Sequence, residues 1–295
     1  MTIEGRSLVF LGTPVAAATV LEHLLTSGFT IEHVVTQPDA KRGRGSALSP
    51  SPVKEVALRH SIPVSHDLTW IQQNAERGLF GIVVAYGKII PTAVLNAVPM
   101  INIHFSLLPR WRGAAPVERA LMAGDSVTGV CIMDIEPTLD TGAVYARQEV
   151  NITEQSTTLS LTAELADAGA HLLVQTLRDG LGSPIPQGQG VTHAAKISRD
   201  ELRISWTQSA VDIHRRIRAI RAFTEIDGAR LRILEAKVEP HSPPVQPGVL
   251  LPSGKVGTGE GVLQLLVVQP EGKSAMDAAS WLRGRPASAS SVFTL

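Results

Sequence analysis

The chain has 295 residues, of which 44% are hydrophobic and 18% are charged, and its 27 basic and 27 acidic side chains balance. This length suits about two globular domains, and the neutral balance excludes a chain that coats nucleic acid over its whole surface but allows a local basic patch. The single cysteine, Cys131, excludes an intrachain disulfide and any zinc site built on several cysteines.

The sequence also predicts neither a targeting segment nor a membrane helix. MTIEGRSLVFLGTP has an early acidic residue and only a brief apolar run, unlike a signal peptide. No segment nears the roughly 18 unbroken apolar residues of a membrane helix. We therefore expect a soluble, cytoplasmic protein without a membrane partner, and a monomer because nothing in the sequence demands an oligomer.

Residues 1–182 alternate between strand-like and helix-like pieces. Short apolar runs predict strands, and stretches with apolar residues three or four apart predict helices. The expected strands are 7–12, 31–37, 81–87, 101–105, 129–135 and 143–150, and the expected helices are 15–28, 52–60, 91–98 and 157–180. Alternation of this kind predicts a Rossmann-like α/β domain whose mostly parallel sheet has helices on both faces, with the last two strands at one edge.

The second part of the chain changes character. Residues 183–206 are rich in glycine, proline and polar side chains, and we interpret them as a linker. Residues 207–295 begin with a basic helix whose buried stripe would be formed by Ala210, Ile213, Ile217 and Ile220. Short strands separated by Pro-Gly and Ser-Gly turns follow, which predict a small OB-like β-barrel. Residues 207–295 carry more Lys and Arg than Asp and Glu, whereas residues 1–206 carry fewer Lys and Arg than Asp and Glu.

Asn102 and His104 are the first candidate site residues. They lie two apart on an expected strand, so they point to the same face, and the following SLLP ends that strand. Ligands of parallel sheets bind at the carboxyl ends of the strands. An amide beside an imidazole suits a carbonyl whose oxygen gains negative charge during attack.

Asp140 is the candidate partner of His104. It lies in a Thr-Leu-Asp-Thr-Gly turn after the next expected strand, and flexibility at Gly142 could bring its carboxylate toward the ring. An aspartate there would orient the imidazole or relay a proton. Taken singly, a histidine at a strand end is more often structural, and an aspartate in a turn is often only a turn former. Cys131 is interpreted as a core residue.

Several other site classes find no support. FLGTP follows a strand but lacks the G-x-G-x-x-G pattern of dinucleotide sites, no phosphate-binding G-x-x-x-x-G-K-[ST] occurs, and histidines at metal-ligand spacing are absent. The residues alone therefore predict an acyl-type transfer site without a metal and leave the acyl group open.

Longer motifs resemble the formyltetrahydrofolate-dependent formyltransferases. The resemblance is carried by FLGTP, TQPDAKRGRG, PSPVK, VVAYGKIIP, INIHFSLLPRWRGAAP, LDTG, KISRDELRISW and VVQPEGKSAM, which run from residue 8 to about residue 276. The TQPD, GRG and PSPVK segments and the second domain are similar to those of members that formylate methionyl initiator tRNA.

The resemblance implies that 10-formyltetrahydrofolate donates the formyl group to the α-amino group of methionine on initiator tRNA, with no metal, for translation initiation. Asn102 and His104 would polarise the formyl oxygen, and Asp140 would orient His104 and help move the amine's proton. The segment that lines the folate pocket would be Ser106, Leu107, Leu108 and Pro109.

The resemblance also implies two surfaces for tRNA. A cationic loop with Lys41, Arg42 and Arg44 would enter the acceptor stem, although a charge run is more often only solvated surface. Arg215, Arg218 and Arg221 on the basic helix would contact phosphates, which position a nucleic acid without reading its sequence. Two of the departures from the family pattern are Phe105, expected to narrow the pocket beside His104, and the stretch from Thr224 to Arg230, where many relatives have Asn-Pro-aromatic-Pro.

Three other functions compete with this interpretation. A formyltransferase acting on an amino sugar nucleotide or a glycinamide would share Asn102, His104 and Asp140. A hydrolase that releases formate would need water at the position of the amine. A non-catalytic RNA-binding module would not require an intact Asn-His-Asp set.

Overall fold

The computed structural model describes residues 6–41, 48–286, 289 and 291–294. The chain divides into two compact units. The first unit comprises Met1–Pro116, Val127–Asn151 and Leu159–Ala194, and the second comprises Val117–Ser126, Ile152–Thr158 and Ala195–Leu295.

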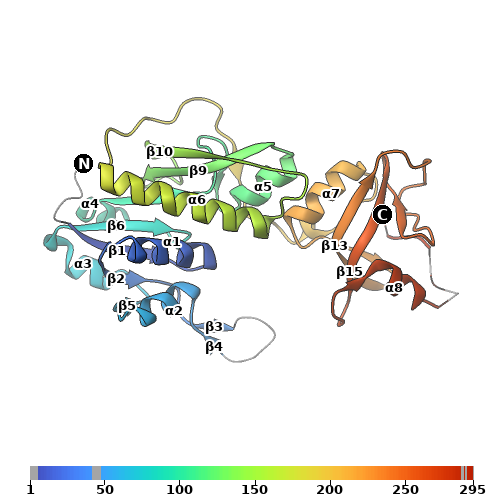
Figure 1. The fold of residues 1–295 in the computed structure, drawn as a ribbon, viewed down its shortest axis with the longest axis horizontal. Coiled ribbons are helices and arrows are strands. Elements are labelled where there is room, and N and C mark those ends of the chain that lie inside the picture. The colour runs from blue at the N-terminus through green and yellow to red at the C-terminus, as the bar shows by residue number, and fades with distance from the viewer. Residues whose placement is uncertain (1–5, 42–47, 287–288, 290, 295) are drawn as a thin grey trace. The chain divides into compact units, whose positions relative to one another are not determined.

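The first unit contains most of the predicted strands and helices (Figure 1). Its strands are β1 (Ser7–Gly12), β2 (Ile31–Val35), β3 (Ala40–Lys41), β4 (Leu48–Ser49), β5 (Val64–Ser65), β6 (Leu79–Val84), β7 (Met100–His104), β8 (Arg112–Gly113), β9 (Val127–Asp134), β10 (Val144–Asn151) and β11 (His193–Ala194). Its helices are α1 (Val15–Thr26), α2 (Pro52–Arg59), α3 (Thr69–Gln73), α4 (Thr92–Ala97) and nearly all of α6 (Thr158–Asp179).

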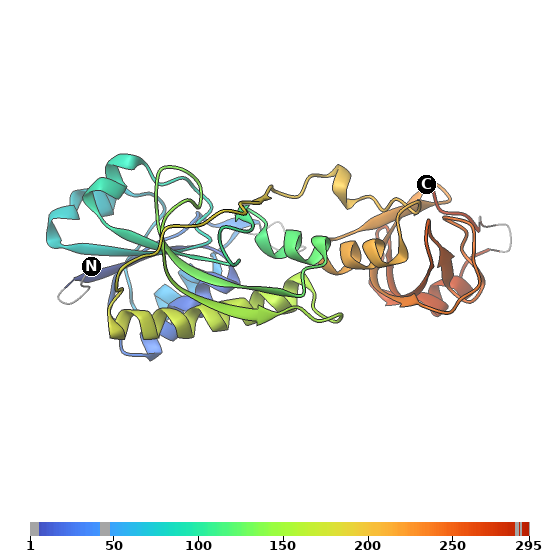
Figure 2. The ribbon, with the colours of Figure 1, turned by 90° about the horizontal axis from the view of Figure 1, so that it is seen from above.

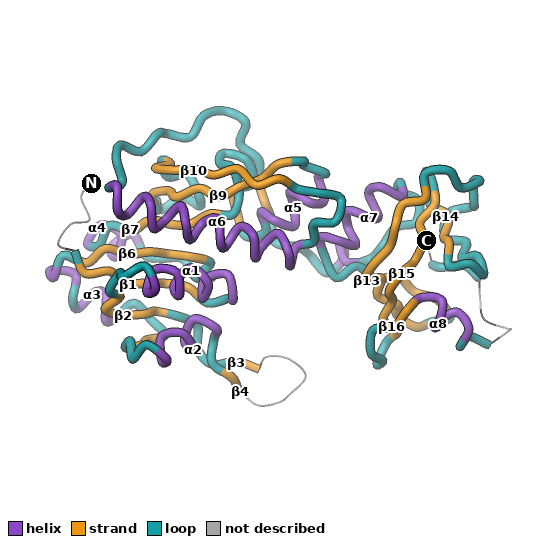
Figure 3. The backbone as a smooth tube through the Cα atoms, viewed as in Figure 1, coloured by secondary structure: helices purple, strands orange, loops and turns teal. Residues whose placement is uncertain are grey.

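Seven strands form the main sheet of this unit, in the order β10-β9-β7-β6-β1-β2-β5 (Figure 3). The strands from β7 to β5 are parallel to their neighbours. Strand β9 runs antiparallel to β7, and β10 runs antiparallel to β9. The predicted α/β fold with a mostly parallel sheet is confirmed, as is the placement of β9 and β10 at one edge.

The two faces of the sheet are covered by different helices. Met100 of β7 belongs to an apolar cluster with Ile71 of α3 and Val94 of α4. On the other face, a methyl group added to Gly169 of α6 would lie 3.1 Å from Ile103, so the helix backbone rests directly on β7. Figure 2 shows α4 (teal) and α6 (yellow) on opposite sides of the sheet. Alternate residues of β7 therefore face different helices.

Local sequence explains where α2 begins. The Ser51 hydroxyl accepts a hydrogen bond from the Lys54 N–H at 3.0 Å, and Pro52 occupies the first helical position. A serine cap satisfies an N–H that has no partner within the helix, and proline at that position loses no hydrogen bond.

The second unit is rich in antiparallel strands. Its elements are α5 (Pro116–Ala123), α7 (Ala210–Ala219), β12 (Phe223–Ile226), β13 (Ala229–Glu239), β14 (Lys255–Gly257), β15 (Val262–Pro270), β16 (Met276–Asp277) and α8 (Ala278–Arg283). The sheet runs β12-β13-β15-β14, with β16 paired to β15. Trp206 stacks on Phe293 with ring centroids 5.0 Å apart and donates to the Thr224 hydroxyl at 2.9 Å. The predicted second domain is confirmed as a unit rich in antiparallel strands.

The basic helix of this unit matches its predicted stripe in three positions. Ala210, Ile213 and Ile217 of α7 are buried, whereas Ile220 lies beyond the helix at its cap and is half-buried. The stretch from Thr224 to Arg230 forms the β12–β13 hairpin. Its turn residues Asp227 and Gly228 have φ values of 52° and 72°, as a two-residue type I′ turn requires.

No helix in the described ranges is long and apolar enough to cross a membrane.

Candidate active site

Asn102 and His104 lie where the sequence predicted, on one face of β7 and at its carboxyl end. His104 is 6% exposed, and Asn102 is half-buried. Their partners on the adjacent strand β9 are Met133 and Cys131. Within the described part of the chain, the Asn102 amide has no side-chain hydrogen bond, so both its donor and its acceptor are free to meet a substrate.

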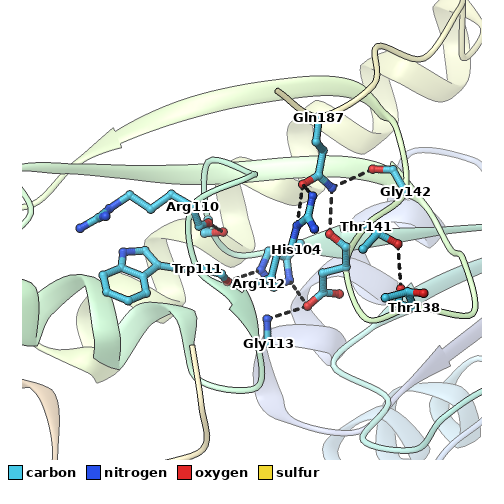
Figure 4. A network of polar contacts seen from close by, with 11 residues as sticks. His104, Arg110, Trp111, Arg112, Gly113, Thr138, Thr141, Gly142 and Gln187 are labelled. Atoms are coloured by element: carbon cyan, nitrogen blue, oxygen red, sulfur yellow. Dashed lines mark hydrogen bonds and ion pairs between the residues drawn. The ribbon is translucent and has the colours of Figure 1, made fainter. Parts of the chain in front are cut away.

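The imidazole of His104 is held between two oxygen atoms (Figure 4). Its Nε2 lies 2.9 Å from the Trp111 carbonyl oxygen, and its Nδ1 lies 3.7 Å from Asp140 Oδ2. A carbonyl only accepts hydrogen bonds, so Nε2 carries a hydrogen. Nδ1 faces the Asp140 carboxylate, which lies opposite the Trp111 carbonyl across the ring. The predicted approach of Asp140 to His104 is confirmed.

Asp140 is itself held by a backbone group. Its Oδ2 accepts a hydrogen bond of 2.8 Å from the Gly113 N–H. Asp140 has a φ of 53°, a left-handed conformation that aspartate adopts more readily than most residues. A methyl group on Gly142 would lie 2.0 Å from the Asp134 carbonyl oxygen. Gly142 therefore lets its backbone lie close to that of Asp134. This packing, and not flexibility as expected, explains the glycine.

The base of the Asp140 loop is closed by hydrogen bonds at the end of β9. The Asp134 N–H donates to the Ala143 carbonyl at 2.9 Å, and the Tyr145 hydroxyl donates to Asp134 Oδ1 at 2.7 Å. Burial, followed by the bond to the Asp134 carboxylate, raises the pKa of Tyr145. Tyr145 thus remains a donor, and the two ends of the loop stay together.

A segment that the sequence presented as a linker crosses this site. Residues 185–194, named here the strap, hydrogen-bond to both loops beside His104. Ile185 exchanges two backbone hydrogen bonds of 2.8 Å with Val144. The Thr192 hydroxyl accepts from the Trp111 N–H at 2.8 Å, and the Thr192 carbonyl accepts from the Arg112 N–H at 2.9 Å. Part of the predicted linker 183–206 therefore belongs to the site.

Gln187 is the strap residue with the most polar contacts. Its Nε2 donates to the carbonyls of Asp140 and Gly142, both at 2.8 Å, and its Oε1 accepts from Arg112 Nε and Nη2 at 2.9 and 2.7 Å. Figure 4 shows Gln187 reaching between Gly142 and Arg112. Sequence reasoning missed Gln187 and Thr192, and a Gly-Pro-rich stretch offers no periodic pattern that would single them out.

The four residues assigned to the folate pocket by resemblance form the turn after β7. Ser106 is buried and its hydroxyl donates to the Arg110 carbonyl at 2.6 Å. Leu108 is 2% exposed and packs in a cluster with Cys131. Leu107 and Pro109 are half-buried. The Ser106 and Leu108 side chains point into the protein, so backbone groups are the parts of those residues left for a ligand.

Two neighbouring residues receive clear structural roles. Phe105 lies on the α6 side of β7, because its ring would be 3.8 Å from a methyl group on Gly169. It does not narrow the pocket beside His104, contrary to the expectation, since residues 104 and 105 point to opposite faces. Cys131 is fully buried, and burial raises the pKa of its thiol, in agreement with the predicted core role.

The predicted nucleic-acid residues differ in their surroundings. Lys41 is exposed at the end of β3, whereas Arg42 and Arg44 lie outside the described residues. On α7, Arg215 pairs with Asp212 at 3.3 Å. Arg218 is half-buried and donates to the carbonyls of Thr153 and Ser156 at 3.2 and 2.6 Å, and Arg221 is exposed.

Arg218 therefore supports the loop 152–158 of its own unit. Burial, with a smaller effect from Arg215, lowers the pKa of Arg218. Its Nε has no hydrogen-bond partner in the described part of the chain. Of the three arginines, only Arg221 is exposed; Arg215 and Arg218 are half-buried.

Comparison with known proteins adds two family matches. The family model described as formyl transferase matches residues 6–177. The model described as formyl transferase, C-terminal domain, matches residues 196–286. The strap lies between the two matched regions.

Solved structures with a similar fold include three proteins of known ligands. HypX from Aquifex aeolicus, in complex with tetrahydrofolic acid, has a TM-score of 0.67 and 16% identity over 95% of this chain and 47% of the HypX chain. The chain thus spans about half the length of HypX. An N-formyltransferase from Helicobacter canadensis, bound to folinic acid and dTDP-3-aminofucose, has a TM-score of 0.67 and 17% identity over 88% of this chain and 99% of that one. The sugar 3N-formyl transferase WlaRD, with dTDP and 5-N-formyl-THF, has a TM-score of 0.69 and 17% identity over 92% and 100%.

Proposed function

The chain belongs to the formyl transferase family, and from this premise we propose that it transfers the formyl group of 10-formyltetrahydrofolate to the α-amino group of methionyl initiator tRNA. The observation that carries the proposal is the contact of His104 with Asp140 at 3.7 Å, beside Asn102 at the carboxyl end of β7. The reaction forms a bond between the amine nitrogen and the formyl carbon. It breaks the bond between that carbon and the folate nitrogen, which takes up the proton that the amine loses.

Asn102 and His104 would stabilise the oxygen of the tetrahedral intermediate. The free amide of Asn102 can donate to this oxygen directly. His104 would exchange its bond to the Trp111 carbonyl for one to the substrate, because its Nε2 hydrogen already points away from Asp140. Each such donor, held in place before the reaction, contributes about 10²–10³ in rate. The Asp140 carboxylate would orient the ring and receive or relay the amine's proton.

The folate donor is supported by the family and by the ligands of similar structures. Tetrahydrofolic acid, folinic acid and 5-N-formyl-THF are bound by HypX, the Helicobacter canadensis enzyme and WlaRD, respectively. In this chain, the turn from Ser106 to Pro109 follows His104 directly and would offer backbone groups to the pterin. Holding the amine and the formyl carbon in contact would supply much of the rate.

The tRNA acceptor is supported by charge in two places. Lys41 is exposed beside Arg42 and Arg44 in the sequence, and Arg221 of the second unit is exposed. Contacts of this kind would bind phosphates, so binding would weaken as salt rises. The second matched family region gives the chain a further unit that could hold a large acceptor.

An amino sugar nucleotide is the second candidate acceptor. It is favoured by the two sugar N-formyltransferases, of whose lengths this chain covers 99% and 100%. Both candidates use the same donor and the same three catalytic residues, so they differ only in the molecule that brings the amine.

Formyl transfer from 10-formyltetrahydrofolate to methionyl initiator tRNA would test the proposal. Free methionine, a dTDP-linked 3-amino sugar and water serve as the alternative acceptors, and His104→Ala is the inactive control. Transfer to the charged tRNA that is lost in His104→Ala supports the proposal. Transfer only to the amino sugar, or release of formate without transfer, would reject the tRNA acceptor.

A further inference from the structure

Gln187 joins the two loops that hold the candidate catalytic pair. Its amide nitrogen donates to Asp140 and Gly142, the carbonyls on either side of Thr141. Its amide oxygen accepts two hydrogen bonds from Arg112, the residue before Gly113. All four distances lie between 2.7 and 2.9 Å, and such bonds are well formed.

Only an amide fits all of these partners at once. The two backbone carbonyls require donors, and the guanidinium requires an acceptor. A glutamate of the same shape would keep the bond to Arg112 and lose both donors to the Asp140 loop. Gln187 is half-buried, whereas Pro186 and Gly188 on either side are exposed. The inward side chain in an otherwise exposed stretch indicates that its contacts are specific.

The carboxylate of Asp140 depends on the same two loops. Its Oδ2 lies 2.8 Å from the Gly113 N–H and 3.7 Å from His104 Nδ1. Gln187 fixes the backbone of Asp140 on one side and the residue before Gly113 on the other. A shift of either loop would therefore change both distances together.

We propose that Gln187 is a positioning residue that holds the Asp140 carboxylate against His104. This proposal rests on the proposed function insofar as the two residues carry formyl transfer. Gln187 acts through Asp140 and need not touch the substrate. Its contribution is to keep the carboxylate in one place, since a displacement of about 1 Å at a catalytic group costs roughly 10²-fold in rate.

The first test needs no substrate and follows hydrogen exchange at single amides. In Gln187→Glu, we expect exchange of the Gly113 N–H to accelerate about 10-fold, because its acceptor is Asp140 Oδ2 and loses its support. The Arg112 and Ala115 amides donate to the strap backbone at 2.9 and 3.2 Å and should stay protected. The matched control is Gln189→Glu, which makes the same charge change on an exposed strap side chain.

The second test is a double-mutant cycle on formyl transfer. We expect Gln187→Glu to lower kcat about 10-fold or more while the KM for the formyl donor changes by less than about 2-fold. In an Asp140→Ala background, the same substitution should change kcat by less than about 2-fold, because the residue through which it acts is gone. Gln187→Met, which has neither donor nor acceptor, provides a second variant if the glutamate perturbs folding.

The outcomes separate this proposal from the function on which it rests. If unmodified protein forms no formylated product with any acceptor, the proposed function fails and the exchange test still decides the role of Gln187. Unchanged Gly113 exchange in both Gln187 variants would overturn the positioning role. An equal loss of kcat with and without Asp140 would also overturn it, since a merely structural contact gives additive losses.

Discussion

The paired side chains of the His104–Asp140 site are largely buried and held in place, whereas Arg221, just beyond α7, is exposed. In the first unit, a buried ring and a carboxylate are held by backbone groups of Trp111 and Gly113. In the second unit, Arg221 is exposed and has no hydrogen-bond partner within the described residues. Group transfer requires fixed atoms, whereas contact with a phosphate requires mainly reach and charge. Substitutions in the two regions should therefore affect different measurements.

Asp140→Asn should give the largest effect. The amide keeps the size of the side chain but loses the negative charge beside His104, so we expect kcat to fall about 10²–10⁴-fold. Steady-state formyl transfer measures this loss. Asp200→Asn, at an exposed aspartate, should leave kcat unchanged, and a similar loss in both variants would contradict a specific role for Asp140.

Gly142→Ala should give the next largest effect on kcat. Its methyl group would lie 2.0 Å from the Asp134 carbonyl, so the Asp140 loop must move, and we expect a loss of roughly 100-fold. Gly188→Ala is the matched control because nothing lies within 4 Å of its added methyl. Full activity in Gly142→Ala would show that the loop tolerates displacement and that the site is less rigid than the first unit suggests.

Arg218→Ala, in α7, and Arg221→Ala, just beyond its end, should separate an effect on stability from an effect on binding. Loss of the Arg218 bonds to Thr153 and Ser156 should lower the free energy of unfolding by about 2 kcal/mol. Arg221→Ala should change it by less than about 0.5 kcal/mol. With the proposed tRNA acceptor, Arg221→Ala should instead weaken binding and reduce the slope of log affinity against log salt by about 1. Denaturation and salt titration measure these effects, and reversed results would exchange the roles of the two arginines.

The smallest effect concerns His33, far from the pair in sequence. Its ring stacks on Trp70 with centroids 4.2 Å apart, and its buried Nδ1 has no hydrogen-bond partner in the described part of the chain. Burial lowers the pKa of His33 below its usual 6.5. The unfolded chain therefore binds a proton first as pH falls below about 6.5, and the folded state loses stability there.

Comparison of unfolding at pH 7.5 and 5.5 tests this dependence. Between these pH values, the free energy of unfolding should fall more in the parent protein than in His33→Gln. The difference should be less than about 1.4 kcal/mol per pH unit, because one proton is involved. An equal loss of unfolding free energy in both proteins would show that His33 does not cause the pH dependence.

The sequence predicted the candidate site best where the residues that act together lie within one strand or helix. Strand alternation places Asn102 and His104 on one face of β7, and the same rule puts Phe105 on the opposite face, against α6. Asp140 was predicted from its turn, but the Gly113 N–H that holds its carboxylate comes from a different loop. Such pairings depend on the tertiary path of the chain, which local patterns do not encode.

The strap shows the same limit more strongly. Gln187 and Thr192 lie in a stretch whose composition predicts irregular structure, and the backbone there is largely irregular. Composition gives no sign of the side-chain hydrogen bonds that these residues make. In the second unit, the Asp227-Gly228 turn was available in the sequence as a hairpin marker.

The order in which a ribosome makes this chain gives the strap a further consequence. A nascent chain that ends at Asp179 already contains His104, Asp140 and all seven strands of the main sheet. The residues that fasten the Asp140 loop, from Ile185 to Ala194, emerge only afterwards. All strands of the main sheet can therefore be made before the strap, and the candidate site is the last part of the first unit to be completed.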